Sequence, residues 1–282
     1  MTLFGTPVPF YKMQGSGNDF IVIDNRALRI PVADMPRWAR KVCARAFGVY
    51  GDGLFFLEES DDPALSYRWH FYNSDGSRAE MCGNASRCAA RLAHALGMAP
   101  AEHVFGTDAG PIRAKVLTEG PEAGRVKVQL TPPTAIATGI ALTVDGQPLT
   151  AHFANTGVPH VVVFVDDVSK VEIMDMGPKL RHHGHFAPAG TNVNFAQVVD
   201  DATLLLRTYE RGVEGETLAC GTGASATQLL ANRLGLTGAK ADLTTTSGEK
   251  LTVTVEGGSV FLQGAAELTF KGELYSEAMG LK

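Results

Sequence analysis

Residues 80–97 read EMCGNASRCAARLAHALG, and residues 218–235 read LACGTGASATQLLANRLG. In both stretches a Cys-Gly pair stands 14 residues before a Leu-Gly pair, so Cys82 and Cys220 occupy equivalent places. Similarity at a fixed offset is the signature of a duplicated structural unit. We therefore expect two similar halves, each of which carries one thiol.

The similarity extends to a second pair of segments. Residues 15–19, GSGND, precede the apolar run FIVI, and residues 155–160, NTGVPH, precede the apolar run VVVFV. Each segment reads as a turn followed by a buried strand. Gly17 and Gly157 are 140 residues apart and the two cysteines are 138 apart, so two features recur at nearly one offset. This agreement argues for duplication rather than chance similarity.

Helices are expected to begin at the two cysteines. Residues 83–96 and 221–234 are rich in Ala, Leu, Arg and Gln, which favour helix. Gly97 and Gly235 follow them, at the place where a left-handed residue commonly ends a helix. A third helix is expected at 34–46. The expected strands are 20–23, 53–57, 67–72, 113–117, 125–130, 141–144, 151–154, 161–165, 193–199, 203–209, 250–255 and 259–263.

These elements predict an α+β fold of two pseudo-symmetric domains. Each domain is expected to be a mixed, barrel-like sheet around a central helix, with the active site in the cleft between the domains. Pro132 and Pro133 mark the linker, because proline does not suit a continuing strand. The N-terminal domain, with the first cysteine, is expected at 1–131 plus a C-terminal return at about 268–282. The second domain, with the second cysteine, is expected at 132–267.

The composition limits the class of protein. At 282 residues, with 45% apolar and 20% charged side chains, the chain is long enough for about two domains. A net charge of −5 without a basic block argues against a nucleic-acid partner. We read no membrane span and no secretory signal in the sequence. Four unevenly spaced cysteines do not resemble a disulfide framework, which favours the reducing cytoplasm.

A cysteine at the start of a helix is suited to chemistry. The first backbone N–H groups of a helix have no partner within it and carry a partial positive charge. They stabilise a thiolate, so we expect a lowered thiol pKa. The same groups can hold a substrate carboxylate, and Gly83, Gly221 and Gly223 let a ligand approach the backbone closely.

Two such thiols suit the inversion of an amino-acid α-carbon. One thiolate removes the proton from one face while one thiol returns a proton to the other face. The backbone N–H groups stabilise the negative charge that develops in the carboxylate. This chemistry requires no pyridoxal-phosphate lysine, and none stands out in the sequence. A different hypothesis is a redox sensor in which the two cysteines form a reversible disulfide.

Other candidate residues carry weaker signals. Cys43 and Cys88 are interpreted as small buried apolar side chains. His182, His183 and His185 lack the cysteine or carboxylate partners that would complete a zinc site, so no metal is expected.

Taken together, the motifs resemble those of the diaminopimelate epimerases, a family of cofactor-independent amino-acid epimerases. The resemblance spans nearly the whole chain, in the order of the family. Its segments are 12–20 (KMQGSGNDF), 71–77 (FYNSDGS), 80–84 (EMCGN), 191–195 (TNVNF), 209–212 (YERG) and 216–223 (ETLACGTG).

The resemblance implies a function and a set of site residues. It implies epimerisation of LL- to meso-2,6-diaminopimelate in lysine and peptidoglycan-precursor biosynthesis, in a cytoplasmic homodimer without a cofactor. Cys82 and Cys220 would be the acid/base thiols, and His160 and Glu210 would tune them. Arg211 suits the distal carboxylate of the substrate by its bidentate fork. The substrate-binding residues would be Asn18, Asn73, Gly83, Asn84, Asn192, Glu210, Arg211, Gly221 and Thr222.

The sequence departs from the family pattern at a few places. Val158 stands where the family often has Asn, and Gly53 where some members carry a substrate-binding Gln. A racemase of the same fold that acts on proline or hydroxyproline is the neighbouring alternative. Those relatives carry His after the first Cys-Gly, whereas this chain has Asn84.

Overall fold

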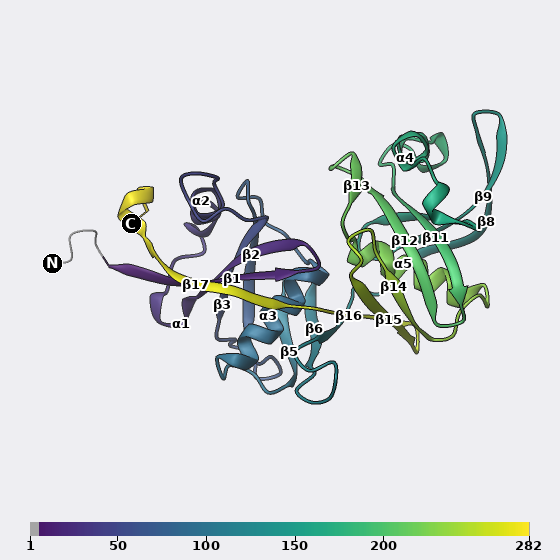
Figure 1. Ribbon diagram of the computed structural model, residues 1–282. Helices are drawn as coiled ribbons and strands as arrows, with labels where there is room; N and C mark the ends of the chain where they lie inside the picture. The colour runs from purple at the N-terminus through teal and green to yellow at the C-terminus, as the bar shows by residue number, and fades with distance from the viewer. Residues whose placement is uncertain (1–5, 282) are drawn as a thin grey trace. The chain divides into compact units, whose positions relative to one another are not determined.

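The computed structural model describes residues 6–281, which form two compact units. Unit 1 comprises residues up to Val128 together with the segment that begins at Ala265, and unit 2 comprises Gln129–Gly264. The first and last of the described residues therefore both belong to unit 1 (Figure 1). The domain limits expected from the sequence lie three residues further along at each boundary, at 131 rather than 128 and at 267 rather than 264.

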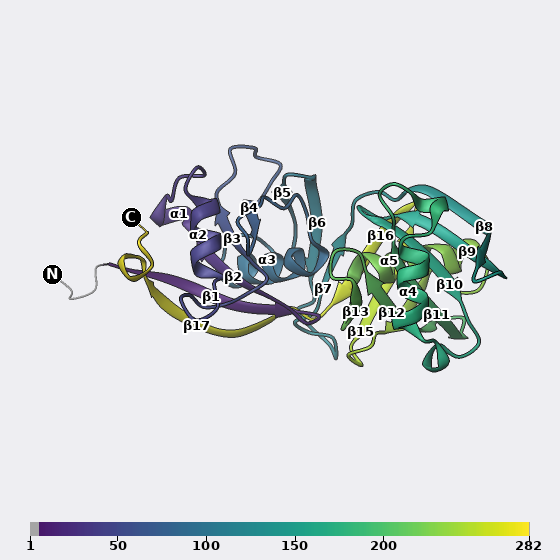
Figure 2. The same cartoon turned by 90° about the horizontal axis from the view of Figure 1, so that it is seen from above.

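Unit 1 is a mixed sheet of parallel and antiparallel strands. Strands β2 and β3 are parallel, as are β4 and β5, and the other pairs are antiparallel. The yellow strand β17 runs beside the purple strand β1 in Figures 1 and 2, although they come from opposite ends of the chain. In sheet order the strands are β17 (Glu267–Tyr275), β1 (Pro7–Gly15), β2 (Asn18–Asp24), β3 (Gly53–Glu58), β4 (Arg68–Asn73), β5 (Glu102–Thr107), β6 (Gly110–Val116) and β7 (Val126–Gln129).

Unit 2 repeats this strand order with its own segments. Strands β10 and β11 are parallel, as are β12 and β14, and the remaining pairs are antiparallel. A short extra strand, β13 (Gly215–Thr217), pairs with the end of β12. In sheet order the strands are β8 (Thr134–Val144), β9 (Gln147–Asn155), β10 (Pro159–Phe164), β11 (Asn192–Asp200), β12 (Thr203–Glu210), β14 (Lys240–Thr244), β15 (Lys250–Glu256) and β16 (Ser259–Gly264).

One buried helix lies within each sheet. Helix α3 (Gly83–Ala95) packs against β1, β2 and β6, and α5 (Gly221–Arg233) packs against β9, β10, β11, β14, β15 and β16. A helix that touches strands so far apart in the sheet order must be wrapped by that sheet. Because a wrapped helix is buried all round, it is built from small and apolar residues. The α+β fold of two similar mixed sheets around central helices is thereby confirmed.

The remaining helices cover the sheets from outside. Helix α2 (Met35–Val42) packs on β3 and β4 through Met35, Trp38, Ala39 and Val42, and α4 (Ile173–Arg181) packs on β11, β12 and β13. Strands covered on both faces read as continuous apolar runs, which explains the segment from Phe20 to Ile23. The short elements are α1 (Asn25–Leu28) and the 3₁₀ turns η1 (Val168–Lys170), η2 (Gly184–Phe186) and η3 (Ser276–Met279).

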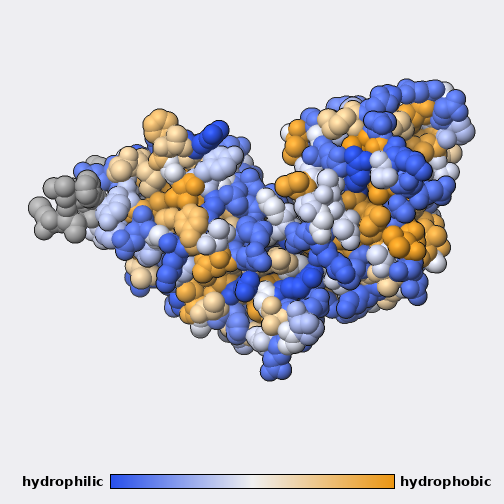
Figure 3. Space-filling model, in the orientation of Figure 1, coloured by the Kyte–Doolittle hydropathy of each residue, from blue (hydrophilic) through white to orange (hydrophobic). Residues whose placement is uncertain are grey.

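The visible surface is mixed in character. On the face drawn in Figure 3, orange apolar side chains are scattered among blue polar ones in both units. Among the described residues, no helix has the length and apolarity needed to cross a membrane.

Candidate active site

Both repeated cysteines occupy the position directly before a buried helix. Cys82 is the N-cap residue of α3, with φ −147° and ψ 124°, and Cys220 is the N-cap residue of α5, with φ −125° and ψ 108°. The helix starts predicted at the cysteines are therefore confirmed. Gly97 and Gly235 follow the helix ends with φ of 70° and 73°, which is the left-handed conformation expected of them.

The sulfur of Cys220 accepts a hydrogen bond from its own helix. The backbone N–H of Gly223 donates to Sγ over 3.4 Å, and the hydroxyl Oγ1 of Thr222 lies 3.5 Å from the same sulfur. A Cβ on residue 223 would collide with the side-chain oxygen of Asn194 and would come within 3.3 Å of Sγ. Glycine at this position therefore allows the thiol, the helix start and β11 to approach one another.

Behind Thr222 lies a buried histidine. The ring of His160, on β10, places Nε2 2.9 Å from Thr222 Oγ1 and Nδ1 3.1 Å from Nδ2 of Asn194 on β11. Asn194 Nδ2 also donates to the carbonyl of Val161 over 2.9 Å, and its Oδ1 accepts from the hydroxyl of Thr208 over 3.0 Å. The His160 and Asn194 side chains are fully buried, so their arrangement is fixed by these bonds.

The environment of Cys220 does not lower its thiol pKa. Burial, and next the negative charge of Glu210, raise the pKa to about 12, against the opposing hydrogen bonds from Thr222 and Gly223. The lowered thiol pKa expected at a helix start is therefore wrong for Cys220. The physical reason is desolvation, because Cys220 is only 8% exposed and a buried thiolate loses its hydration.

The imidazole of His160 is neutral at physiological pH. Burial, and then the positive charge of Arg211, lower its pKa to about 3. His160 can therefore donate one hydrogen bond and accept another, but it does not contribute a positive charge near the thiol.

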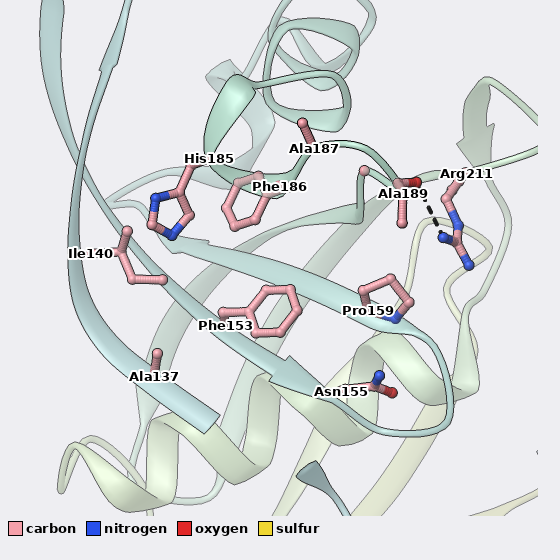
Figure 4. A pocket seen from close by; sticks show the side chains of 11 residues that line it. Ala137, Ile140, Phe153, Asn155, Pro159, His185, Phe186, Ala187, Ala189 and Arg211 are labelled. Carbon is pink, nitrogen blue, oxygen red and sulfur yellow. Dashed lines mark hydrogen bonds between the residues drawn. The ribbon is translucent and has the colours of Figure 1, made fainter. Parts of the chain in front are cut away.

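Arg211 opens onto a cavity in unit 2. The cavity has a volume of about 420 Å³ and is lined by Phe153, Asn155, Pro159 and Phe186 among others (Figure 4). Nη1 of Arg211 donates to the carbonyl of Ala189 over 3.2 Å, as the dashed line in Figure 4 shows. An arginine at the wall of such a cavity can bind a carboxylate.

The neighbouring polar residues of unit 2 hold backbone in place. The amide of Asn192 accepts from the backbone N–H of Arg211 over 2.8 Å and donates to the carbonyl of Pro159 over 2.9 Å. The carboxylate of Glu210 accepts from the Thr217 hydroxyl over 2.7 Å. Asn192 thus fixes the backbone that carries Arg211, and Glu210 adds a negative charge close to Cys220.

Unit 1 presents a chain of amides beside its half-buried cysteine. Nδ2 of Asn84, two residues after Cys82, donates to Oδ1 of Asn18 over 2.7 Å. Nδ2 of Asn18 in turn donates to the carboxylate of Asp52 over 2.9 Å. Asn73 is exposed at the end of β4, where its Nδ2 donates to the Ser77 hydroxyl over 2.9 Å.

The structure groups the predicted site residues within each unit. Unit 1 holds Asn18, Asn73, Cys82, Gly83 and Asn84, and unit 2 holds His160, Asn192, Glu210, Arg211, Cys220, Gly221 and Thr222.

Two further polar residues were not singled out from the sequence: Asn194 orients His160, and Asp52 orients Asn18. Asn155, in the motif NTGVPH, was not chosen as a site residue, and it lines the cavity beside Arg211. Asn194 belongs to the motif TNVNF, but nothing in a single sequence distinguishes it from Asn192 as a partner of the histidine.

Cys43 and Cys88 are not at the start of a helix, and the histidines at 182, 183 and 185 form no metal-binding group among the described residues. Cys43 lies in the core beneath α2, and Cys88 lies inside α3, so both are buried apolar residues as predicted. Within residues 6–281, no group of three or more His, Cys, Asp and Glu side chains is arranged to hold a metal ion.

Comparison with known proteins places these features in a family. The sequence model of the family described as "Diaminopimelate epimerase" matches residues 10–136 and 152–269. The chain is 47% identical over 279 residues to a diaminopimelate epimerase of Aquifex aeolicus, with 96% of this chain and 99% of the relative covered. It is 41% identical over 278 residues to one of Archaeoglobus fulgidus, with 95% and 96% covered.

Solved structures of similar fold are more distant in sequence. A hydroxyproline epimerase of Agrobacterium vitis superposes with a TM-score of 0.69 at 16% identity, with 95% of this chain and 92% of that chain covered. A phenazine biosynthesis protein of Bacillus anthracis superposes with a TM-score of 0.71 at 13% identity, with 96% and 99% covered. At these identities the likeness concerns the fold alone.

Proposed function

Because the chain belongs to the diaminopimelate epimerase family and is an isomerase, we propose that it interconverts LL- and meso-2,6-diaminopimelate with two cysteine thiols and no cofactor. The observation that carries the proposal is the duplicated cysteine, which directly precedes a buried helix in each unit. Such a pair offers two thiols and two sets of free backbone N–H groups.

In this proposal Cys82 and Cys220 act on opposite faces of the α-carbon. Cys82, as thiolate, takes the α-proton, and the electron pair left on carbon is delocalised into the carboxylate. The thiol of Cys220 then delivers its proton to the other face, which leaves a thiolate at Cys220 and a thiol at Cys82. No electron is gained or lost, and the reverse reaction exchanges the two roles.

The surroundings of Cys220 support its proposed role as the initial acid. Burial and Glu210 raise the pKa of this thiol to about 12, so it holds its proton at neutral pH. An acid that is protonated at rest must be helped to release its proton when the carbanion forms. The N–H of Gly223, which already donates to Sγ, provides part of that help.

The remaining proposed residues recognise the two ends of the substrate. The free N–H groups around Gly83, Asn84, Gly221 and Thr222 bind the carboxylate next to the reacting carbon. Arg211 binds the distal carboxylate, for which its position at the wall of the cavity is suited. Glu210 faces the distal ammonium, and the amides of Asn18, Asn73 and Asn192 supply further donors and acceptors.

The wider setting follows from the family resemblance. We place the reaction in the cytoplasm, in the biosynthesis of lysine and of peptidoglycan precursors, and we propose a homodimer. Light scattering on the purified protein measures the mass in solution, and a value of one chain contradicts the dimer.

Proton NMR in D₂O tests the proposed reaction directly. The reduced protein, without added pyridoxal phosphate, is expected to replace the α-proton of LL-diaminopimelate with deuterium and to produce the meso isomer. Cys82→Ser and Cys220→Ser are each expected to slow epimerisation by about 10²–10⁴-fold, because each removes one acid/base group. Full epimerisation by either variant contradicts the two-thiol mechanism.

Two amino acids serve as substrate controls. Proline and hydroxyproline are the substrates of the neighbouring alternative, and neither carries a distal carboxylate for Arg211. We expect no α-proton exchange with either of them. Exchange with proline but not with diaminopimelate would assign the chain to the racemase activity instead.

A further inference from the structure

A continuous line of hydrogen bonds runs from β11 to the sulfur of Cys220. It passes from Asn194 Nδ2 to His160 Nδ1 over 3.1 Å, from His160 Nε2 to Thr222 Oγ1 over 2.9 Å, and from Oγ1 to Sγ over 3.5 Å. The two-thiol mechanism uses the sulfur of Cys220 and the backbone N–H at Thr222, while the side chains of Asn194, His160 and Thr222 have no role in it as acid or base.

The orientation of the Asn194 amide is set by its surroundings. Its nitrogen faces the carbonyl of Val161 at 2.9 Å, and its oxygen accepts from the Thr208 hydroxyl. A flipped amide would place its oxygen against the Val161 carbonyl, with two acceptors in contact in a fully buried site. Asn194 therefore presents an N–H to His160.

This donor determines the tautomer of the histidine. Because Nδ1 accepts from Asn194, the single proton of the neutral ring resides on Nε2. Nε2 then donates to Thr222 Oγ1, so the threonine cannot donate its own proton back to the ring. The Thr222 hydroxyl proton is left to point at the sulfur of Cys220, which lies 3.5 Å from Oγ1.

We propose that Asn194, His160 and Thr222 form a directional hydrogen-bond relay that presents a hydroxyl donor to Cys220 and stabilises its thiolate. The three are positioning residues, since they act through the sulfur of Cys220. The benefit to catalysis rests on the proposed epimerase mechanism, whereas the effect on the thiol does not.

The charged groups near the relay do not change which atoms donate its hydrogen bonds. Among the described residues, the charged groups that act on it are Glu210, which acts on Cys220, and Arg211, which acts on His160. Burial, and then the charge of Arg211, hold the pKa of His160 near 3, so the ring does not become a double donor above about pH 5. Thr222 therefore offers the same donor to the sulfur throughout the working range of a cytoplasmic enzyme.

Alkylation of the thiol tests the relay without any need for activity. The intact protein is treated with iodoacetamide across a pH series, and modification of the peptides that contain Cys220 and Cys82 is followed by mass spectrometry. We expect Thr222→Val to slow alkylation of Cys220 about tenfold at a given pH, because a thiolate loses one hydrogen-bond donor. The rate at Cys82 provides the internal reference.

Two matched variants separate the hydroxyl from general damage. Thr222→Ser keeps the hydroxyl and is expected to return the Cys220 alkylation curve towards that of the wild type. Thr227→Val removes a buried hydroxyl in the same helix that has no hydrogen-bond partner among the described residues. It is expected to leave the curve unchanged. Identical curves for Thr222→Val and the wild type overturn the relay.

The tautomer of His160 provides a second measurement on the unaltered protein. In ¹⁵N NMR, the relay requires the proton on Nε2 and a non-protonated Nδ1 at neutral pH. A proton on Nδ1 overturns the proposal even if the threonine variants fail to fold.

Kinetics then connect the relay to the reaction. We expect Thr222→Val to lower kcat by a larger factor than it raises KM, with Thr222→Ser recovering more of kcat than of KM. If the wild type does not epimerise diaminopimelate but the alkylation shift is seen, the proposed function fails and the relay stands. If the wild type epimerises but the shift is absent, the relay fails alone.

Discussion

The thiol of Cys220 is subject to effects that shift its pKa in opposite directions. Burial and Glu210 favour the thiol, while Gly223 and Thr222 donate hydrogen bonds that favour the thiolate. The net effect is a pKa raised to about 12, so the thiol holds its proton at neutral pH. The sequence showed the helix start but not the extent of burial, which depends on strands far away in the chain. This is why the sign of the pKa shift could not be predicted from the motif.

A first prediction concerns the carboxylate beside this thiol. Glu210→Gln removes a negative charge and is expected to lower the pKa of Cys220, so that alkylation at a given pH becomes faster. Epimerisation is expected to fall in the same variant, because the carboxylate proposed to face the distal ammonium of the substrate is lost. Glu214→Gln, in the following turn, removes an exposed carboxylate bonded to Arg181 and serves as the control. A slower alkylation rate in Glu210→Gln would contradict the assigned role.

A second prediction concerns stability against acid. The pKa of His160 in the folded protein, about 3, lies below its ordinary value, so the unfolded chain binds a proton that the folded chain does not. The contribution of His160 to the free energy of unfolding is fully present above about pH 6.5. It falls by about 1.4 kcal/mol per pH unit as the pH drops towards about 3. His160→Gln is expected to show a shallower decline in urea unfolding between about pH 7 and about pH 4. Equal slopes for the two proteins would exclude this contribution.

At the scale of elements, the best-predicted segments are those buried on all sides. Strands β2 and β10 carry the apolar runs FIVI and VVVF, and helices α3 and α5 are rich in small residues, because each element is covered by the rest of its unit. Strand β1 was missed because its two prolines and alternating polar residues resemble a loop. It forms through pairing with β17 and β2. The pairing with β17, from the other end of the chain, cannot be predicted from the local sequence pattern.

Two helices also differ from the prediction, because their extent depends on contacts with the rest of the chain. The helix expected at 34–46 ends at Val42, because Cys43 caps it and the chain turns back so that Val49 bonds to the carbonyl of Val42. Helix α4 was not predicted, since it contains both Gly177 and Pro178. Gly177 is needed there, because any Cβ would collide with the ring of Tyr209.

The approach of α5 to β11 gives a third prediction. In Gly223→Ala the new methyl group meets the side chain of Asn194 and crowds the sulfur of Cys220. We expect a loss of about 1–3 kcal/mol in the free energy of unfolding from overpacking, together with a severe loss of epimerisation. Gly215→Ala meets no atom within 4 Å and is the matched control. Wild-type stability and activity in Gly223→Ala would contradict the close approach of Gly223 to the Asn194 side chain.

At the scale of the whole molecule, the duplication is clearer in the structure than in the sequence. Two glycine turns and two cysteines predicted it, and the strand orders show it element by element, with parallel pairs in the same places. The edge strand β17 in unit 1 has the place that β8 has in unit 2, yet one follows its unit in the chain and the other precedes its own.

The placement of β17 leads to a fourth prediction. A chain that stops after Gly264 lacks the strand that pairs with β1, and it also lacks the carbonyl of Ala265 that accepts from the buried Arg87 over 3.1 Å. We expect unit 1 to lose hydrogen-exchange protection in β2 and β3 while β11 and β12 retain theirs. A chain that stops after Tyr275 keeps β17 and is expected to lose far less. Protection lost equally in both units would show that they fold as one.

The same strand affects how the protein is made. Unit 2 is complete in the nascent chain once Gly264 has been added, whereas unit 1, although it begins at the N-terminus, still lacks its last strand. Synthesis therefore finishes the second half before the first. Until β17 has left the ribosome, β1 has an unpaired edge with which another polypeptide can form a strand pair. The nascent chain is therefore exposed to aggregation at this edge.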